Sequence, residues 1–221
     1  MPELWVCHLG RVDYAEAAAL QERLRDRVRA GELPETMLLL EHPPVYTVGR
    51  RTADADLPLP SVGIDVVKTP RGGQLTYHAP GQLVGYPIMR VENVPEFVLT
   101  MERAIVAALA DAGLEAGTRL GHKHVGVWVG ERKIASVGIH IAQGVSAHGF
   151  AVNVENDLAP FSQVVACGLP DVTMTSLAAE GIAEGLHCFR KRMAFRFCEA
   201  FGRRQRLVTP QRLGLPALVA A

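Results

Sequence analysis

The sequence predicts an α/β domain of the α+β type, built on a mixed, mainly antiparallel sheet flanked by helices. Apolar runs of strand length outnumber the helical stripes, and most are bounded by turn residues. A tight turn joins two of these runs, as in an antiparallel hairpin. Strict alternation of strand and helix, which would favour a parallel sheet, is absent. With 221 residues, the chain is expected to form one domain over residues 1-221.

The first half of the chain predicts a helix among short strands. A first strand is expected around Val6 and Cys7. Asp13 then begins a helix, with Glu16 at capping-box spacing, leucine or valine at every fourth position and a stop at Gly31. Further strands are expected at residues 37–41, 45–48, 62–68 and 83–89.

The second half predicts two more long helices and a hairpin. Asn93 and Glu96 repeat the capping spacing, and the helix that they begin ends at Gly113. Valines alternate with Gly126 and Trp128 before a Gly-Glu turn, which favours a hairpin. The other expectations are strands at 125–129, 133–141 and 148–154, a short helix at 160–165, a loop at 166–173, and a last helix with the apolar stripe Phe189, Met193, Phe197 and Phe201.

Composition narrows the classes of function. Basic and acidic residues both number 23, so the formal net charge is zero, which disfavours a general nucleic-acid role. No apolar stretch is long enough to span a bilayer, and the N-terminus lacks a signal-peptide pattern. We therefore expect a cytoplasmic protein without a membrane partner. His122 and His124 could bind a metal, but the pattern is weak and favours a solvated loop, so no metal is expected.

The cysteines are expected to be reduced thiols, because they form no CxxC pair and no metal-finger spacing. Cys7, Cys188 and Cys198 lie in predicted elements and are interpreted as packing residues. Cys167 stands instead in the turn-rich segment VVACGLPDVT, and loops on a rigid sheet often carry catalysis. A nucleophilic cysteine reacts as the thiolate, which a nearby cation favours. Lys133 is a candidate for that cation, and a solvated lysine at a strand end is the alternative.

The stretch RGGQLTYHAPGQLVGYPI, residues 71–88, predicts the wall of a pocket. Gly72 and Gly73 permit backbone conformations and close approaches that a Cβ would block. Tyr77 and His78 each add a flat ring with a polar end, which suits a wall beside a bound molecule. The pattern does not by itself name a reaction.

Several segments, taken in order, resemble the octanoyltransferases, which are the lipoyl(octanoyl) transferases of lipoate biosynthesis. These segments are LLLEHPPVYTVGR, RGGQLTYHAPGQLVGYPI, GVWVGERKIASVGI, HGFAVNV and ACGLPDVTMTSL. The resemblance covers nearly the whole chain. Ala79 stands where the family usually has Gly, and Ala166 where it commonly has Pro, but neither change removes a reactive group.

This resemblance implies the fold of the biotin and lipoate protein ligases, and no cofactor. It implies transfer of an octanoyl or lipoyl group from acyl carrier protein to lysines of lipoyl domains, in 2-oxoacid dehydrogenases and the glycine-cleavage protein. Cys167 would carry the acyl group, with Lys133 as its partner. The acyl-binding residues implied are Arg71, Gly72, Gly73, Gln74, Leu75, Thr76, Tyr77, His78, Ser136, Val137, Gly138, Gly149, Phe150 and Ala151.

Two alternative functions would require different residues of this sequence. An ATP-dependent lipoate or biotin protein ligase would need a basic, glycine-rich phosphate loop, and neither GRRTADADLP nor RGGQ combines both features. A non-enzymatic module that binds carrier or lipoyl domains would not require both Cys167 and Lys133. Because carrier proteins are usually acidic, basic residues are expected at the mouth of the acyl site, with ordinary solvated arginines as the alternative. The candidates are Arg50, Arg51, Arg203, Arg204 and Arg206.

Overall fold

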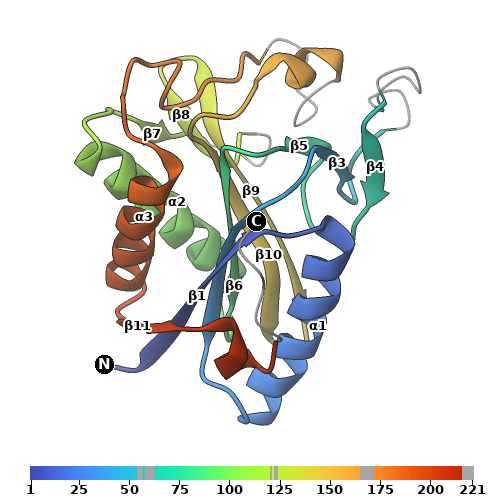
Figure 1. Ribbon diagram of the computed structural model, residues 1–221, viewed down its shortest axis with the longest axis vertical. Helices are drawn as coiled ribbons and strands as arrows, with labels where there is room; N and C mark the ends of the chain where they lie inside the picture. The colour runs from blue at the N-terminus through green and yellow to red at the C-terminus, as the bar shows by residue number, and fades with distance from the viewer. Residues whose placement is uncertain (54–56, 58–62, 120, 122–123, 165–171, 216–221) are drawn as a thin grey trace.

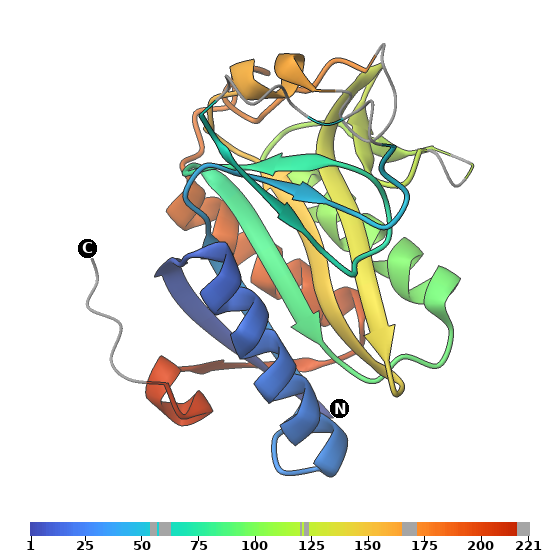
Figure 2. The ribbon, with the colours of Figure 1, turned by 90° about the vertical axis from the view of Figure 1, so that its right-hand side faces the viewer.

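The central feature of the fold is a long mixed sheet with helices on both faces. The computed structural model describes residues 1–53, 57, 63–119, 121, 124–164 and 172–215. Helices α2 (Val94–Asp111) and α3 (Leu186–Ala200) cover one face of this sheet, and α1 (Tyr14–Ala30) covers the other (Figure 1). A smaller sheet crosses one end of the large sheet, above α1 (Figure 2). No helix in the described ranges has the length and apolar character needed to cross a bilayer.

The large sheet has the order β11-β1-β2-β6-β10-β9-β8-β7. Strand β1 pairs in parallel with β11 and β2, and the other described pairs are antiparallel, which confirms the predicted mixed, mainly antiparallel sheet. Its strands are β1 (Glu3–Arg11), β2 (Thr36–Glu41), β6 (Gln82–Ile88), β7 (Gly117–Thr118), β8 (Val127–Val129), β9 (Arg132–Ala142), β10 (Val145–Asn153) and β11 (Arg204–Val208).

The smaller sheet lies across the end of β6 and is formed by strands between residues 45 and 78. It has the order β4-β3-β5, with β3 (Val45–Val48), β4 (Asp65–Lys68) and β5 (Thr76–His78). Strand β5 lies within the stretch predicted to be a pocket wall, and it is a strand because its residues pair with β3. The expected strand at 62–68 is observed from Asp65, and residue 62 lies outside the described residues.

The predicted caps form the helix ends. Asp13 accepts a hydrogen bond from the N–H of Ala15 at 2.8 Å, and Asn93 accepts one from the N–H of Glu96 at 3.1 Å. Gly31 ends α1 in the left-handed conformation, with φ of 76°. The short helix expected at 160–165 is a 3-10 helix, η3 (Ala159–Gln163), and a second one, η5 (Pro210–Leu213), follows β11. Of the expected loop at 166–173, residues 166–171 lie outside the described residues.

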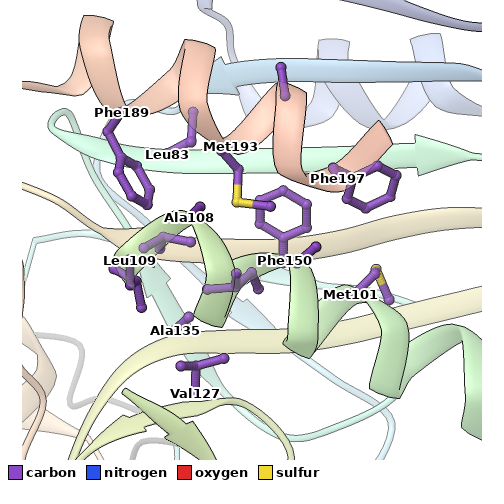
Figure 3. Close-up of a cluster of buried hydrophobic side chains, with 14 of the residues drawn as sticks. Leu83, Met101, Ala108, Leu109, Val127, Ala135, Phe150, Phe189, Met193 and Phe197 are labelled. Carbon is purple, nitrogen blue, oxygen red and sulfur yellow. The ribbon is translucent and has the colours of Figure 1, made fainter. Parts of the chain in front are cut away.

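The main core lies between the large sheet and the pair α2 and α3. Side chains from both helices interdigitate with β6 and β10, and Phe150 lies at the centre beside Met193 (Figure 3). The predicted stripe of α3 is largely inside, since Phe189, Met193 and Phe197 are fully buried. A separate cluster joins α1 to the opposite face of the sheet. The sheet is thereby held from both sides, which makes β9 and β10 a rigid support for any site at their ends.

Gly85 on β6 is expected to be sensitive to the smallest side chain. It pairs with Phe150 across the ladder, and a Cβ built on it would overlap the Phe150 ring. We expect Gly85→Ala to lower the free energy of unfolding by about 1–3 kcal/mol, because overpacking a dense core is costly. Phe150→Leu should lower stability alone but relieve the overlap in the double variant. Urea unfolding of the four proteins measures this coupling, and strictly additive losses would contradict it.

Candidate active site

A cavity of about 800 Å³, including its open mouth, lies between the small sheet and strands β9 and β10. Its size falls within the range of small-molecule sites. Tyr14 closes it from α1, and Arg51 lines it beside the small sheet. The predicted site residues that line the cavity are Arg71, Gly73, Gln74, Thr76, His78, Lys133, Ser136, Val137, Gly138, Gly149, Phe150 and Ala151.

The other predicted wall residues lie behind this surface. Alternate side chains of a strand point to opposite faces, so Thr76 and His78 face the cavity while Tyr77 faces away from it. Leu75 and Tyr77 are buried in the cluster beneath the small sheet, where the Tyr77 ring lies 5.4 Å from that of Phe161. Gly72 donates its N–H to Ile139 O at 2.8 Å and ties this loop to β9.

Arg71 organises the loop at the cavity wall. Its guanidinium donates to Gln74 O at 2.7 Å, to Thr47 O at 2.6 Å and to Thr47 Oγ1 at 2.8 Å. Gly49 must be a glycine for this packing, because a Cβ there would come within 2.5 Å of the Gly73 carbonyl oxygen and within 2.8 Å of the Arg71 guanidinium. Arg71 therefore joins the wall loop to β3, besides presenting charge to the cavity.

Lys133 lies in the cavity wall and is 2 % exposed, which rules out a solvated lysine at a strand end. Its Nζ donates to Val125 O at 2.8 Å and lies 5.4 Å from the centre of the Trp128 ring. Its backbone also pairs with the segment 173–175, since Lys133 N–H donates to Thr173 O and Thr175 N–H donates to Lys133 O, both at 2.9 Å. Cys167 and Ala166 lie outside the described residues.

A chain of buried hydrogen bonds connects the wall to that same segment. Gln82 donates its amide N–H to Asn153 Oδ1 at 2.9 Å, and Asn153 donates to Thr175 O at 2.9 Å. The side-chain oxygen of Gln82, Oε1, accepts from His78 Nδ1 at 2.7 Å. His78 Nε2 lies 3.4 Å from the Thr47 hydroxyl, which the Arg71 guanidinium also contacts. The position of Thr175 is thereby coupled to the shape of the cavity wall.

A cluster of buried aromatic side chains was missing from the predicted site: Tyr14, Tyr86 and His148 line the cavity, and His42 contacts Tyr86. Tyr86 donates its hydroxyl to His42 Nε2 at 2.7 Å, and His42 Nδ1 donates to Val12 O at 2.7 Å. The Tyr14 hydroxyl lies 3.5 Å from His148 Nδ1. Burial raises the pKa of Tyr14 to about 12 and lowers the pKa of His42 to about 4 and of His148 to about 3. At neutral pH these groups are uncharged, so they form a wall suited to an uncharged chain.

The remaining cysteines differ in exposure. Cys7 and Cys198 are buried, as expected, and burial raises their pKa to about 12 and about 11, which disfavours the thiolate. Cys188 was expected to pack inside but is exposed, because the adjacent Phe189 occupies the inward position of α3. His122 lies outside the described residues. Among the residues that are described, no group of at least three His, Cys, Asp or Glu could hold a metal ion.

The basic candidates for a docking surface separate into two places. Arg51 lines the cavity, and Arg50 N–H donates to Arg71 O beside it. The cluster of Arg203, Arg204 and Arg206 was expected at the mouth but lies at the start of β11, an edge strand that four other strands separate from β9. Arg203 pairs there with Glu35, and the other two with Glu3. These ion pairs connect the start of β11 to Glu3 of β1 and to Glu35.

Comparison with solved structures gives the class of fold. A lipoate-protein ligase A bound with ATP has a TM-score of 0.76 at 17% identity, over 96% of this chain and 92% of that one. The biotin protein ligase of Aquifex aeolicus has a TM-score of 0.54 at 14% identity, over 91% and 70% of the two chains. The fold is therefore that of the lipoate and biotin protein ligases, as the sequence resemblance implied.

Sequence comparison narrows this class. Residues 13–194 match the lipoyl protein ligase A/B catalytic domain. An octanoyltransferase of Solibacter usitatus is 44% identical, over 87% of this chain and 90% of that protein. One of Dictyoglomus turgidum is 42% identical, over 87% of this chain and 84% of that protein. The chain belongs to the octanoyltransferase family.

Stability is expected to fall below about pH 6.5, because buried histidines take up protons when the chain unfolds. Their folded-state pKa values, about 4 for His42 and about 3 for His148, are lower than the value near 6.5 of an unfolded chain. The unfolded state then binds more protons, so the free energy of unfolding rises with pH across this window. Each group contributes up to about 1.4 kcal/mol per pH unit.

His42→Gln should reduce the number of protons taken up on unfolding by about one, and therefore reduce the slope of the free energy of unfolding against pH. Urea unfolding at several pH values between about 4 and 7 measures the slope. Exposed His187→Gln is the matched control and should leave the slope as in the parent protein. An unchanged slope in His42→Gln would show that the folded protein does not keep His42 neutral.

Proposed function

We propose that this chain takes an octanoyl group from the phosphopantetheine thioester of acyl carrier protein onto Cys167 and passes it to a lysine of a lipoyl domain. Membership of the octanoyltransferase family makes octanoyl transfer its reaction. The single observation that supports the finer mechanism is the placement of Lys133, which is buried in the cavity wall and hydrogen-bonded to the segment after Cys167. The donor, the acceptor and the covalent carrier are the proposal.

The two proposed steps balance without a further reactant. The Cys167 thiolate attacks the thioester carbonyl, a new C–S bond forms, and the phosphopantetheine sulfur leaves as a thiolate. The acceptor ε-amine then attacks the enzyme thioester, the amide bond forms and Cys167 leaves as a thiolate. Lys133 as the ammonium favours the first thiolate and then gives its proton to the departing phosphopantetheine thiolate. As the resulting neutral amine it accepts the proton that the attacking amine loses. Division into two steps allows each protein partner to dock separately.

The cavity supports an acyl chain as the group transferred. Val137, Phe150 and Ala151 supply apolar surface, and the aromatic cluster is uncharged at neutral pH. The cations Arg71 and Lys133 lie in the same wall, where they can face a reacting carbonyl. Because burial of each CH₂ contributes about 0.8 kcal/mol, the length of the cavity can select the length of the chain.

The ATP-dependent ligase is the rival that shares this fold, so the fold does not separate the two reactions. The transferase forms an acyl-enzyme without a nucleotide, whereas the ligase requires ATP. Incubation of the pure protein with octanoyl-carrier protein in the absence of ATP, followed by mass spectrometry, separates them. An octanoyl adduct on the intact protein supports the transferase, and a strict ATP requirement supports the ligase. Absence of any reaction supports a binding module.

Cys167→Ala should abolish transfer and adduct formation, with a loss of at least about a thousandfold, because no other group would carry the acyl chain. The change removes one small polar atom, so the thermal unfolding midpoint should stay near that of the parent protein. The control changes Cys7, Cys188 and Cys198 together to Ala. Transfer near the parent rate in Cys167→Ala, or loss of the adduct in a folded triple variant, would show that Cys167 is the wrong carrier.

Lys133→Arg should separate the two roles of this lysine. Guanidinium stays protonated, so adduct formation should remain within about tenfold of the parent rate. Discharge to a lipoyl domain should slow by about 10²–10⁴, the usual contribution of a general base. Lys133→Ala should impair both steps. Single-turnover measurements give the two rates, and a discharge rate in Lys133→Arg equal to that of the parent would exclude the proton-acceptor role.

A further inference from the structure

We propose that Glu102 is a positioning residue for Lys133 and acts through the peptide group between Val125 and Gly126. The inference rests on the role of Lys133 in the proposed function. It assigns a task to a buried carboxylate that lies outside the cavity wall. Through this peptide, Glu102 would hold the Lys133 ammonium in place and favour its charged form.

The placement of Glu102 on α2 is unusual. The inner face of this helix is otherwise built from apolar side chains such as Met101 and Ile105, which are fully buried. Glu102 is only 6 % exposed among them. A buried carboxylate costs stability unless it has partners, so a residue that only filled space here would be apolar.

One peptide group links the carboxylate to the ammonium. Glu102 accepts the N–H of Gly126 at 2.6 Å, and the carbonyl oxygen of the same peptide group, that of Val125, accepts from Lys133 Nζ at 2.8 Å. A carboxylate at the N–H end polarises the peptide and makes its carbonyl oxygen a stronger acceptor. The two charged side chains therefore stabilise one another through a fixed backbone dipole.

The backbone conformation and the missing side chain of Gly126 both suit its position between Glu102 and Lys133. Its φ of 135° is a conformation that side chains other than that of glycine rarely adopt. A Cβ there would come within 2.5 Å of Lys133 Cε and 3.1 Å of Lys133 Nζ. The glycine thus leaves the space that the lysine occupies, in addition to presenting its N–H to Glu102.

The electrostatics of the pair agree with the geometry. Burial raises the pKa of Glu102, while the hydrogen bond from Gly126 and the positive charge of Lys133 both act to lower it. The positive charge of Lys133 therefore partly offsets the cost of burying the Glu102 carboxylate.

Other charged groups surround the lysine. Arg71 lines the same cavity, Arg119 lies over Trp128 and His124 packs against the edge of that ring. Arg132, the preceding residue of β9, pairs with Glu180. None of these groups is bonded to Glu102 in the described residues, so the variant below is designed to remove one charge and leave these groups unchanged.

The test is Glu102→Gln, which keeps an oxygen that can accept from Gly126 but removes the charge. Single-turnover rates of adduct formation and of discharge are measured across pH. We expect the alkaline limb of adduct formation, where the ammonium is lost, to move to lower pH by about one unit. The discharge rate should reach its plateau at lower pH by a similar amount. A role in folding alone would lower both rates at every pH without moving either profile.

Glu96→Gln is the matched control, because it removes one carboxylate from an exposed position on the same helix. Both of its pH profiles should coincide with those of the parent protein. Profiles of Glu102→Gln that also coincide with the parent, or that shift no more than those of Glu96→Gln, would overturn the inference.

A second measurement keeps this inference separate from the proposed function. The protein has lysines at 68, 123, 133 and 191, so ¹³C-lysine labelling gives few signals, and Lys133→Arg identifies the one from Lys133. In Glu102→Gln the midpoint of the Lys133 ¹³Cε titration should move to lower pH. This shift supports the coupling even if Cys167→Ala still transfers, an outcome that would refute the proposed function alone. An unmoved midpoint would overturn the coupling whatever the transfer assay shows.

Discussion

The backbone pairing of Lys133 with residues 173–175 is the constraint on which the site depends. Strand β9 carries Lys133 at its start and Ser136 to Gly138 further along, so one rigid strand supplies both the amine and part of the cavity wall. The two backbone hydrogen bonds of Lys133 with Thr173 and Thr175 hold residues 173–175, which follow Cys167 in the sequence, against the start of β9. A catalytic pair needs its members within about 3 Å, and such placement requires rigid support on both sides.

That support comes from opposite faces of the fold. On one face, α2 and α3 pack against β6, β9 and β10, and Glu102 contacts the N–H of Gly126 from within this core. On the other side, the small sheet lays β5 across the end of β6, where His78 and Gln82 join the hydrogen-bond chain that reaches Thr175. Polar networks of this kind are stabilising when every member is satisfied. The cavity is thus the meeting point of a hydrophobic core and a buried polar network, each of which restrains a different wall.

The sequence predicted the elements better than the contacts between them. Asp13, Gly31 and Asn93 act locally, so the ends of α1 and the start of α2 could be predicted from neighbouring residues alone. Strand β11 could not, because its sequence RQRLV lacks a strand pattern and it forms by pairing with β1, far away in the chain.

The same distinction explains what was missed in the site. His42, Tyr86 and His148 come from separate elements and meet through tertiary folding, so no local spacing marks them. In sequence, Glu102 is one charge in a helix, and its burial becomes visible once α2 is placed against the hairpin. The direction of the Tyr77 side chain could have been predicted from the sequence, because successive side chains of a strand point to opposite faces and Tyr77 precedes His78.

The distribution of charge around the cavity bears on which reaction this fold carries out. The fold is shared with ligases that use ATP, so the chemistry must be decided by the side chains placed around the cavity and not by the sheet. In this chain burial keeps the aromatic cluster neutral, while Lys133 and the buried Glu102 bind the two ends of one peptide group. A neutral wall binds an acyl chain without competing for the reacting carbonyl. In the proposed two-step transfer, Lys133 would stabilise a thiolate in one step and accept a proton in the next. The way the fold buries its polar groups is compatible with both proposed roles.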